Sequence, residues 1–332
     1  MNNEDEKIVQ DILRAIEDST SFIIFSHENP DSDAIGSQLA LYLALDRTGK
    51  TVYAFSTTDT CPCNKFLPHS DAIKMELPTD GSFDTAIVLD CANPDRIGME
   101  IDFSQYKTVI NIDHHISNRN FGSLNWVSTK TSSTGELVYR LITAMGSPVD
   151  ADIATCLYAA MFADTGGFRH SNTGVQTLCF ASELVAAGAD PHYIASNLFG
   201  RFPEKKIRLL GKSLQTLSTI EEGRVAYMWA NTDHYAETGG DITDADEFVE
   251  YPRSIGGVDI AILFKEIAAN EMTRVNFRSN HPECNVNSIA SVFGGGGHSE
   301  ASACNVSGTR EEVQRSVLKV VREEIASSEK RK

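Results

Sequence analysis

The sequence predicts an α/β protein of two domains, the first built on a doubly wound parallel sheet and the second a smaller α/β domain. With 332 residues the chain exceeds the usual size of one domain. Short β-rich apolar runs alternate with helical patterns in the N-terminal half. A stretch bearing Gly and Pro, 188–203, then precedes a second group of strands. We expect domains over 1–188 and 219–332, with a linker and connector helix over 189–218.

The periodicity of apolar residues places the elements along the chain. In the N-terminal half it predicts helices near 8–16, 34–45, 134–145, 152–162 and 174–187, and strands at 22–25, 51–55, 85–89 and 108–112. Ser133 and Glu136 have the spacing of a capping box at the start of one helix. The C-terminal half is expected to hold a helix over 203–217, strands near 225–229, 260–264 and 273–277, a Gly-rich loop and a charged final helix.

Charge and composition exclude several classes of protein. A formal net charge of −17 argues against a protein that coats long nucleic acid, although a short anionic substrate remains compatible if bound divalent cations invert the local potential. Seven scattered Cys fit reduced thiols, and the Cys61–Cys63 pair fits a loop better than a metal knuckle. The start MNNEDEK does not resemble a signal peptide, and no apolar run is long enough to span a bilayer. We expect a cytoplasmic protein with no membrane partner.

The segment SHENPDSDAIGS lies where a predicted strand ends and a helix begins, the place where open α/β sheets bind ligands. It brings His27, Asp31 and Asp33 together around a turn stiffened by Pro30. Imidazole and carboxylate ligands suit Mn²⁺, with Mg²⁺, Fe²⁺ or Co²⁺ also possible. On its own the segment fits an Asx-rich turn with a helix N-cap equally well.

Three later segments place the same residue types at the ends of predicted elements. The apolar run AIVLD ends on Asp90, VINIDHH ends on Asp113, His114 and His115, and MFADTGGF puts Asp164 at the end of a helix. Parallel strands deliver their carboxyl ends to one edge of the sheet, so these groups can converge. Clustered carboxylates repel one another, and two divalent cations would compensate that repulsion. One metal site explains all four segments.

A second set of candidates lies near the C-terminus. In the run FGGGGHSEASA, backbone N–H groups can approach a phosphate at Gly295, Gly296 and Gly297, although a glycine run alone is more often a flexible turn. His298 follows this run directly. Arg278, on a predicted strand, offers a bidentate grip on a phosphate or carboxylate, or else is a solvated edge-strand arginine.

The HxNPDxD, LD, DHH and DTGG segments, in this order, resemble the DHH phosphoesterase family. The GGGGH segment and the RS pair resemble its partner domain, DHHA1, so the resemblance covers residues 8 to about 310. It implies two metal ions, Mn²⁺ first among them, with Asp90 bridging both. It implies that His27, Asp31 and Asp90 hold one ion, and that Asp33, Asp90, His114 and Asp164 hold the other.

The resemblance also implies roles for residues that do not bind metal. Asp113 would orient a ligand or the loop, and His115 would face the phosphate, as a proton donor or a stabiliser of charge. The substrate would be held by the DHHA1 residues Arg278, Ser279, Gly295, Gly296, Gly297 and His298, with Arg253 a weaker candidate. Ser299 and Glu300 depart from the basic or small residues of many relatives, which leaves substrate preference open.

Chain length and the pairing of the two domains resemble the stand-alone oligoribonucleases called nanoRNases. The resemblance implies hydrolysis of short oligoribonucleotides and of adenosine 3′,5′-bisphosphate, without action on long duplexes, and a homodimer is possible. The closest alternative is a phosphodiesterase for linear or cyclic dinucleotides. A manganese pyrophosphatase would lack the GGGGH segment, a RecJ-type exonuclease would need a basic track, and a non-catalytic nucleotide-binding protein would have substituted ligand positions.

Overall fold

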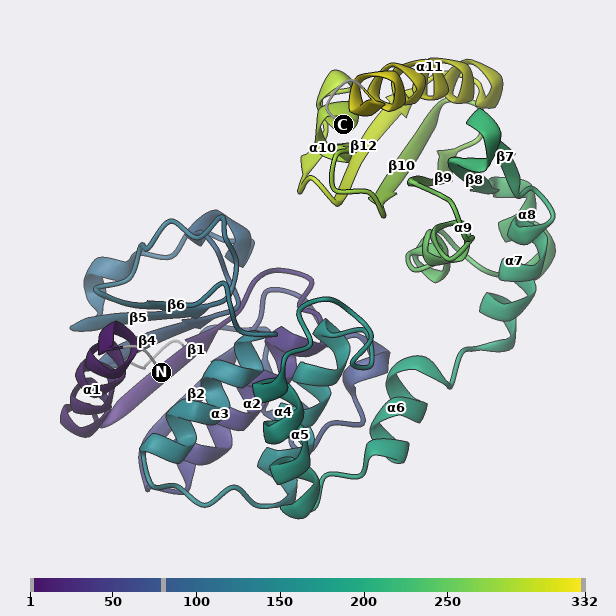
Figure 1. Cartoon of the computed structure of the whole chain (residues 1–332). Coiled ribbons are helices and arrows are strands. Elements are labelled where there is room, and N and C mark those ends of the chain that lie inside the picture. The colour runs from purple at the N-terminus through teal and green to yellow at the C-terminus, as the bar shows by residue number, and fades with distance from the viewer. Residues whose placement is uncertain (1–2, 79–81, 330–332) are drawn as a thin grey trace. The chain divides into compact units, whose positions relative to one another are not determined.

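The computed structural model describes residues 3–78 and 82–329, and its contacts form two compact units (Figure 1). The N-terminal unit is Met1–Arg201 and the C-terminal unit is Phe202–Lys332. The domain boundaries expected from the sequence stay a prediction. Among the described residues, no helix is long and apolar enough to cross a membrane.

The N-terminal unit contains a parallel sheet of the order β3-β2-β1-β4-β5-β6. Because the order reverses between β1 and β4, the chain winds in both directions from the middle of the sheet, which confirms the doubly wound α/β prediction. The strands are β1 (Ser21–Phe25), β2 (Thr51–Phe55), β3 (Ile73–Lys74), β4 (Thr85–Leu89), β5 (Thr108–Asp113) and β6 (Leu124–Val127).

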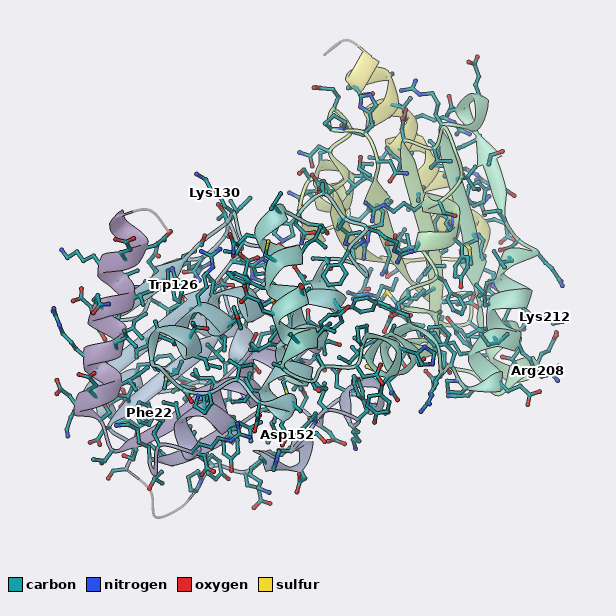
Figure 2. The ribbon with its side chains drawn as sticks, turned by 60° about the horizontal axis from the view of Figure 1, so that its bottom comes forward. Phe22, Trp126, Lys130, Asp152, Arg208 and Lys212 are labelled. Carbon is teal, nitrogen blue, oxygen red and sulfur yellow. The ribbon has the colours of Figure 1, made fainter. Side chains whose placement is uncertain are left out.

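Helices cover one face of this sheet, and short 3₁₀ segments and aromatic side chains cover the other. The main core lies under the helices and includes Phe22 and Trp126, both fully buried (Figure 2). On the opposite face, Phe103 and Tyr106 contact the ring of Phe25 edge-on. The helices are α1 (Asn3–Asp18), α2 (Ser32–Asp46), α3 (Thr134–Ala144), α4 (Ala151–Asp164), α5 (Val175–Ala186) and α6 (Pro191–Phe199).

Helix α6 occupies the stretch that the sequence marked as an exit from the first domain. Pro191 stands in its first turn, and the Asp190 side chain accepts hydrogen bonds from two backbone N–H groups there. Both residues are typical of a helix start. Ile194 and Leu198 are buried in the core of the N-terminal unit. Pro191 therefore begins a helix and does not interrupt the structure.

The described part of the C-terminal unit contains a mixed sheet of the order β11-β12-β10-β9-β8-β7, in which the β8–β9 pair is parallel and the other pairs are antiparallel. The strands are β7 (Ser218–Ile220), β8 (Val225–Ala230), β9 (Ile260–Ala268), β10 (Met272–Ser279), β11 (Gly296–Gly297) and β12 (Ala301–Ser307). The helices are α7 (Glu204–Leu214), α8 (Thr232–Thr238), α9 (Glu250–Arg253), α10 (Val286–Val292) and α11 (Arg310–Glu329).

Candidate metal centre

The four acidic and histidine segments meet at the carboxyl edge of the N-terminal sheet. His27 lies two residues after β1, Asp90 directly after β4, and His114 directly after β5. Since the strand order reverses between β1 and β4, the cluster lies at the topological switch point, where such sheets bind ligands. Donor atoms lie within 4.8 Å of one another in three overlapping groups: His27, Asp31 and Asp90; Asp33, His114 and Asp164; and Asp90, His114 and His115.

Asp90 is common to two of these groups, and His114 links it to the third. Its Oδ2 lies 3.6 Å from His27 Nε2, and its Oδ1 lies 3.6 Å from His114 Nε2. Its backbone has φ +54°, a left-handed conformation that only Asn, Asp and Gly adopt with ease. The turn after β4 thus holds a carboxylate between two imidazole rings.

Asp33 is held by the amino end of a different helix. Asp31 caps α2, and Asp33 stands in the first turn of the same helix. The Asp33 carboxylate accepts hydrogen bonds from Thr134 N at 2.7 Å and Gly135 N at 2.8 Å, the first N–H groups of α3. These N–H groups have no partner within their helix, so the carboxylate satisfies them and is itself fixed in orientation.

Backbone and carboxylate acceptors fix the histidine rings. His27 Nδ1 lies 2.8 Å from Glu28 O, which can only accept, so Nδ1 carries the hydrogen and Nε2 is available as a ligand. His115 Nδ1 lies 2.7 Å from Asp113 Oδ1. Asn118 donates to the other oxygen of Asp113 at 2.6 Å. Asp113 therefore orients His115 and is itself held in place.

The field of the cluster shifts the pKa values of its members in opposite directions. Burial and the neighbouring charges of Asp90 and Asp164 raise the pKa of Asp33 well above its usual range. Burial, with Asp90 adding to it, also raises the pKa of Asp164 to about 6. Burial opposes the ionisation of Asp90, but the hydrogen bond to His27 and the charges of His115 and His114 lower its pKa to about 2.

The histidines respond in the complementary sense. Burial disfavours the charged form of His115, but the hydrogen bond to Asp113 and the charge of Asp90 outweigh it and raise its pKa to about 9. The same balance, with Asp90 as the main partner, raises the pKa of His27. Without a cation, the site therefore favours the protonated forms of His27 and His115 and of at least one carboxyl group.

The donor set fits divalent cations. In the described parts of the chain, no Lys or Arg forms an ion pair with Asp31, Asp33, Asp90 or Asp164, so the side chains leave the carboxylate charge uncompensated except by histidine. Imidazole nitrogens and carboxylate oxygens are the ligands that Mn²⁺ and similar ions accept. The residues present therefore fit a divalent metal site, and the identity of the ion stays a prediction.

In the C-terminal unit, two of the predicted substrate residues converge on a carboxylate that the sequence did not single out. Arg278 Nε lies 3.4 Å from Glu250 Oε1, and Arg253 Nη1 lies 3.2 Å from Glu250 Oε2. Arg253 also donates to Asn280 Oδ1 at 2.9 Å. Ser279 is buried, and its hydroxyl donates to His281 O.

The last two residues of the glycine run form β11 beside β12, and the sheet register places them at the same end as Arg278. Gly297 pairs with Ser302, and Arg278 pairs with Ala301. A Cβ at Gly295 would lie 2.3 Å from Ala303 O, and one at Gly297 would lie 2.4 Å from Ala301 O. Close approach to β12 thus requires glycine at both positions. His298 follows and is exposed.

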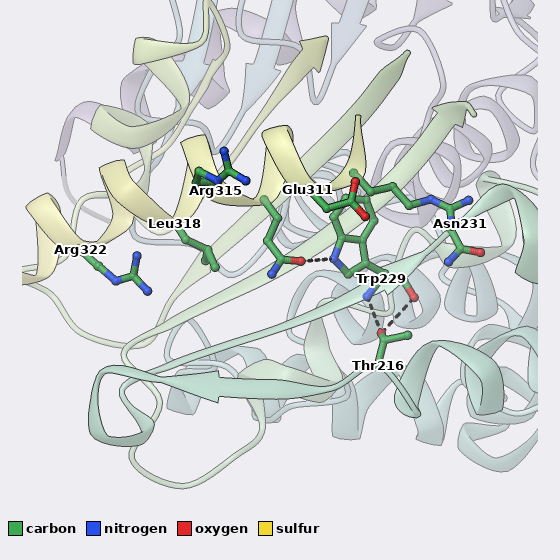
Figure 3. A pocket seen from close by; sticks show the side chains of 9 residues that line it. Thr216, Trp229, Asn231, Glu311, Arg315, Leu318 and Arg322 are labelled. Atoms are coloured by element: carbon green, nitrogen blue, oxygen red, sulfur yellow. Dashed lines mark hydrogen bonds between the residues drawn. The ribbon is translucent and has the colours of Figure 1, made fainter. Parts of the chain in front are cut away.

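The C-terminal unit also has a cavity of about 500 Å³ (Figure 3). Although three arginines line it, Arg310 is paired with Glu266 and Asp233, and Arg322 with Glu221. The carboxylates therefore offset most of its positive charge. Its walls are formed by Thr216, Trp229, Asn231, Arg310, Glu311, Gln314, Arg315, Leu318 and Arg322.

Sequence reasoning missed several polar partners in the metal centre. Thr134 Oγ1 donates to Asp90 Oδ1 at 3.0 Å, Asn172 Nδ2 donates to Asp164 Oδ2 at 3.3 Å, and Asn118 holds Asp113. The capping-box spacing at Ser133 marked the start of α3. It gave no indication that this helix start faces Asp33.

Comparisons with known proteins find relatives that match nearly the whole chain. The DHH family, N-terminal domain, matches residues 21–161. The bifunctional oligoribonuclease and PAP phosphatase NrnA of Thermus thermophilus is 33% identical over 328 residues, covering 97% of this chain and 95% of that protein. The protein of the same name in Bacillus subtilis is 31% identical, over 89% of this chain and 92% of that one.

A solved structure extends the similarity to the whole fold. An exopolyphosphatase-related protein from Bacteroides fragilis superposes with a TM-score of 0.85 at 27% identity, covering 96% of both chains. Since the matches to the two NrnA proteins span both units and the family match contains Asp90 and the DHH segment, the chain belongs to the DHH phosphoesterase family.

Proposed function

We propose that this protein is a metal-dependent phosphoesterase that degrades short oligoribonucleotides to mononucleotides and removes the 3′-phosphate of adenosine 3′,5′-bisphosphate. The observation that carries the proposal is the convergence of His27, Asp31, Asp33, Asp90, His114 and Asp164 at one sheet edge. The names of the two NrnA relatives, which match nearly the full chain, support the same substrates.

The proposed metal centre contains two divalent ions, with Mn²⁺ preferred because of the mixed nitrogen and oxygen ligands. We assign His27, Asp31 and Asp90 to one ion, and Asp33, Asp90, His114 and Asp164 to the other. Bound ions would neutralise the phosphoryl oxygens and lower the pKa of a water molecule, so that hydroxide would be available to attack phosphorus at neutral pH. Asp90, placed between His27 and His114, is the shared ligand in this proposal.

His115 is proposed as the proton donor. Its Nδ1 is engaged by Asp113, which leaves Nε2 as the ring nitrogen that can serve the substrate. Attack by water forms a new P–O bond and breaks the bond to the leaving ribose oxygen, which takes the Nε2 proton of His115. Asp113 keeps the ring in one tautomer and orientation, and Asn118 keeps Asp113 in place.

Arg278, Gly295, Gly296, Gly297 and His298 are the proposed substrate contacts, with Arg253 and Ser279 in supporting positions. Arg278 and Arg253 share Glu250, so a substrate phosphate would compete with that carboxylate for the two guanidinium groups. Such competition favours a strongly charged terminal phosphate over a singly charged internal phosphodiester. The cytoplasmic location and the absence of a membrane partner belong to the same proposal.

A homodimer is also part of the proposal. Helix α5 exposes Val175, Leu178 and Val185, which are 82%, 51% and 41% exposed and lie along one stripe of the helix. A second copy of α5 is the partner we propose for this stripe. Analytical ultracentrifugation should give the mass of a dimer for the parent chain and of a monomer for Leu178→Glu. A monomeric parent at all concentrations would reject the dimer.

The decisive test is a substrate panel. Chelator-treated protein is supplied with Mn²⁺, Mg²⁺ or Co²⁺ and assayed on short RNAs, adenosine 3′,5′-bisphosphate, a linear and a cyclic di-adenylate, and pyrophosphate. We expect short RNA and the bisphosphate to be the best substrates, and Mn²⁺ the best ion. Preference for the cyclic dinucleotide would favour the dinucleotide phosphodiesterase alternative, and hydrolysis of pyrophosphate alone would refute the proposed function.

A further inference from the structure

Three of the predicted metal ligands are tied to one short segment, residues 131–135, which we name the α3 start segment. Thr134 N and Gly135 N donate to the two oxygens of Asp33 at 2.7 and 2.8 Å. Thr134 Oγ1 donates to Asp90 Oδ1 at 3.0 Å. The carboxylates of Asp33 and Asp90 therefore take their orientation from this segment.

The link to the third ligand, Asp164, runs through Asn172. Asn172 Nδ2 lies 2.9 Å from Ser132 O, 3.2 Å from Asp164 O and 3.3 Å from Asp164 Oδ2. One side-chain amide thus joins the α3 start segment to the end of α4, where Asp164 lies. Loss of this amide would remove the hydrogen bond from Asn172 Nδ2 that orients the Asp164 carboxylate.

Glu136 holds the α3 start segment from the opposite side. Its Oε2 accepts from Ser132 N at 3.2 Å and from Ser132 Oγ at 2.9 Å. The predicted capping box is therefore only half formed: Ser133 Oγ accepts from Glu136 N, but the Glu136 carboxylate turns to Ser132. All three polar groups of Ser132, namely N, O and Oγ, are engaged by Glu136 and Asn172.

The Glu136 carboxylate is itself firmly anchored. Its residue is 2% exposed, Arg140 Nη2 donates to its Oε1 at 2.6 Å, and Thr177 Oγ1 of α5 donates to its Oε2 at 3.1 Å. A buried carboxylate with a charged partner and three further donors has one stable orientation. It can transmit that orientation to the α3 start segment.

We propose that Glu136 and Asn172 are positioning residues that set the affinity of the centre for divalent ions, by fixing the α3 start segment against Asp33, Asp90 and Asp164. The inference rests on the proposed metal function, because it assigns these residues a role in holding those ligands. Partners that orient metal ligands through hydrogen bonds typically change metal affinity 10- to 100-fold when removed.

The competing explanation is that Glu136 merely joins α3 to α5. The chain offers a matched control one turn along the same helix pair, where Tyr139 of α3 donates a hydrogen bond to Glu183 of α5. Tyr139→Phe removes an α3–α5 hydrogen bond but leaves every contact of the α3 start segment in place. This variant therefore reports how much a lost contact between α3 and α5 changes Mn²⁺ affinity when the contacts to the metal ligands are kept.

The experiment measures Mn²⁺ binding to the chelator-treated full chain by electron paramagnetic resonance of free Mn²⁺, well below the melting temperature of each variant. We expect Glu136→Gln to raise the Mn²⁺ dissociation constant about tenfold or more, because its amide N–H₂ cannot accept from Ser132 while its oxygen serves Arg140. Asn172→Ala, on an exposed residue and so compatible with folding, should have a similar effect. Tyr139→Phe should lie within about twofold of the parent while lowering the melting temperature.

Parent-like Mn²⁺ affinity in both Glu136→Gln and Asn172→Ala would overturn the positioning role while leaving the metal centre intact. If Tyr139→Phe weakened Mn²⁺ binding as much as the other two variants, the positioning role would be overturned as well, since general helix packing would then explain the loss of affinity. A parent chain that binds no Mn²⁺ would instead refute the proposed metal function from which this inference starts.

Discussion

The cluster of predicted metal ligands in the N-terminal unit and the buried charges of the C-terminal unit are compensated in different ways. In the N-terminal unit, Asp33 and Asp90 are 1% exposed and meet histidines and neutral donors. In the C-terminal unit, Glu266 is equally buried, but Arg310 donates to both of its oxygens at 2.9 and 2.7 Å. The charge of Glu266 is therefore compensated by an arginine of the chain. The carboxylates of the N-terminal cluster need positive charge from outside the protein.

Lys265 extends the contrast. It is 3% exposed and pairs with Asp246, so even a buried ammonium group of the C-terminal unit has its counter-charge on the chain. A buried charge without a partner costs several kcal/mol. We therefore expect divalent ions to bind in the N-terminal unit. Substitutions at its ligands should weaken metal binding, and substitutions in the C-terminal unit should weaken substrate binding alone.

The largest effect is expected for Asp90→Asn. This change removes the charge that joins the two groups of ligands, while Asn tolerates the left-handed backbone at φ +54° as readily as Asp does. Turnover should fall by about 1,000-fold or more, beyond the 10- to 100-fold typical of residues that only orient ligands. Mn²⁺ occupancy, measured by atomic emission after dialysis, should fall with it.

The matched control is Asp95→Asn. Asp95 lies five residues further along the chain, and its largely exposed side chain is 3.7 Å from Arg119. The substitution should leave turnover and Mn²⁺ occupancy unchanged. Parent-like activity of Asp90→Asn at saturating Mn²⁺ would contradict the two-metal centre and would remove the contrast between the units.

The next effect belongs to the C-terminal unit. Arg278→Ala removes a guanidinium group assigned to the substrate phosphate, and His298→Ala removes its neighbour in the proposed site. Each should lower kcat/KM by about 10- to 100-fold, as expected for a lost hydrogen bond to a charged group, without changing Mn²⁺ affinity. The readings are initial rates with adenosine 3′,5′-bisphosphate and Mn²⁺ titrations.

Arg274→Ala is the control on the same strand. Arg274 and Arg278 are four residues apart on β10 and so share a face of the sheet, but Arg274 is not a predicted substrate contact. If Arg274→Ala lowers kcat/KM as much as Arg278→Ala does, the effect reflects general charge and the assignment of Arg278 is rejected.

Much of the N-terminal fold could be predicted because its central parallel strands, β1, β4 and β5, are buried on both faces and read as short apolar runs. The runs ending at Leu89 and Asp113 gave both the sheet and the place where ligands gather. Asp31 shows that two interpretations of one segment can both hold. It caps α2, as the Asx-turn interpretation requires, and it also lies within reach of His27 and Asp90.

What the sequence could not give are partners without a distinctive side-chain pattern. The donors to Asp33 are backbone N–H groups of Thr134 and Gly135, about a hundred residues away, and any residue type supplies a backbone N–H. Glu250 was missed because an exposed carboxylate in a charged segment has many possible partners. The metal and substrate roles of the predicted residues stay predictions until the experiments above are done.

A smaller effect is expected from substrate length. Each added nucleotide brings another phosphate toward a chain of net charge −17, and no basic stretch offsets the repulsion. We expect kcat/KM to be highest for about two to five nucleotides and at least about tenfold lower for an RNA of roughly 25 nucleotides, at one fixed salt concentration. Little action on duplexes is expected. Rates that stay flat or rise with length would favour a RecJ-type activity.

The smallest effect is a difference in how the two units respond to pH without metal. The folded pKa of Asp164 is about 6, above the ordinary value of 3.8, so the folded N-terminal unit binds a proton more tightly than the unfolded chain and gains stability as pH falls from 7 to 5. For a pKa of about 6 the gain is about 1 kcal/mol. His115 acts in the same sense, because its raised pKa contributes stability that is lost as pH rises toward 9.

The C-terminal unit should respond in the opposite sense over the same range. Burial lowers the pKa of His234, so this unit loses stability as pH falls through the ordinary histidine range. Burial opposes the ionisation of Glu266, but Arg310 outweighs it and lowers the pKa to about 2. Its contribution is therefore present above about pH 4.5 and is lost only as pH falls toward 2.

The two tryptophans of the chain allow the units to be followed separately, since Trp126 lies in the N-terminal core and Trp229 in the C-terminal core. Trp229→Phe leaves Trp126 as the reporter, and Trp126→Phe leaves Trp229. In chelator the urea midpoint seen by Trp126 should rise between pH 7 and pH 5, and that seen by Trp229 should fall. Saturating Mn²⁺ should reverse the trend at Trp126, because protons then compete with the ion for the same carboxylates and a ligand at 100 times its Kd stabilises by about 2.7 kcal/mol. Midpoints that move together, with or without Mn²⁺, would show that the N-terminal carboxylates are not the uncompensated charges described here.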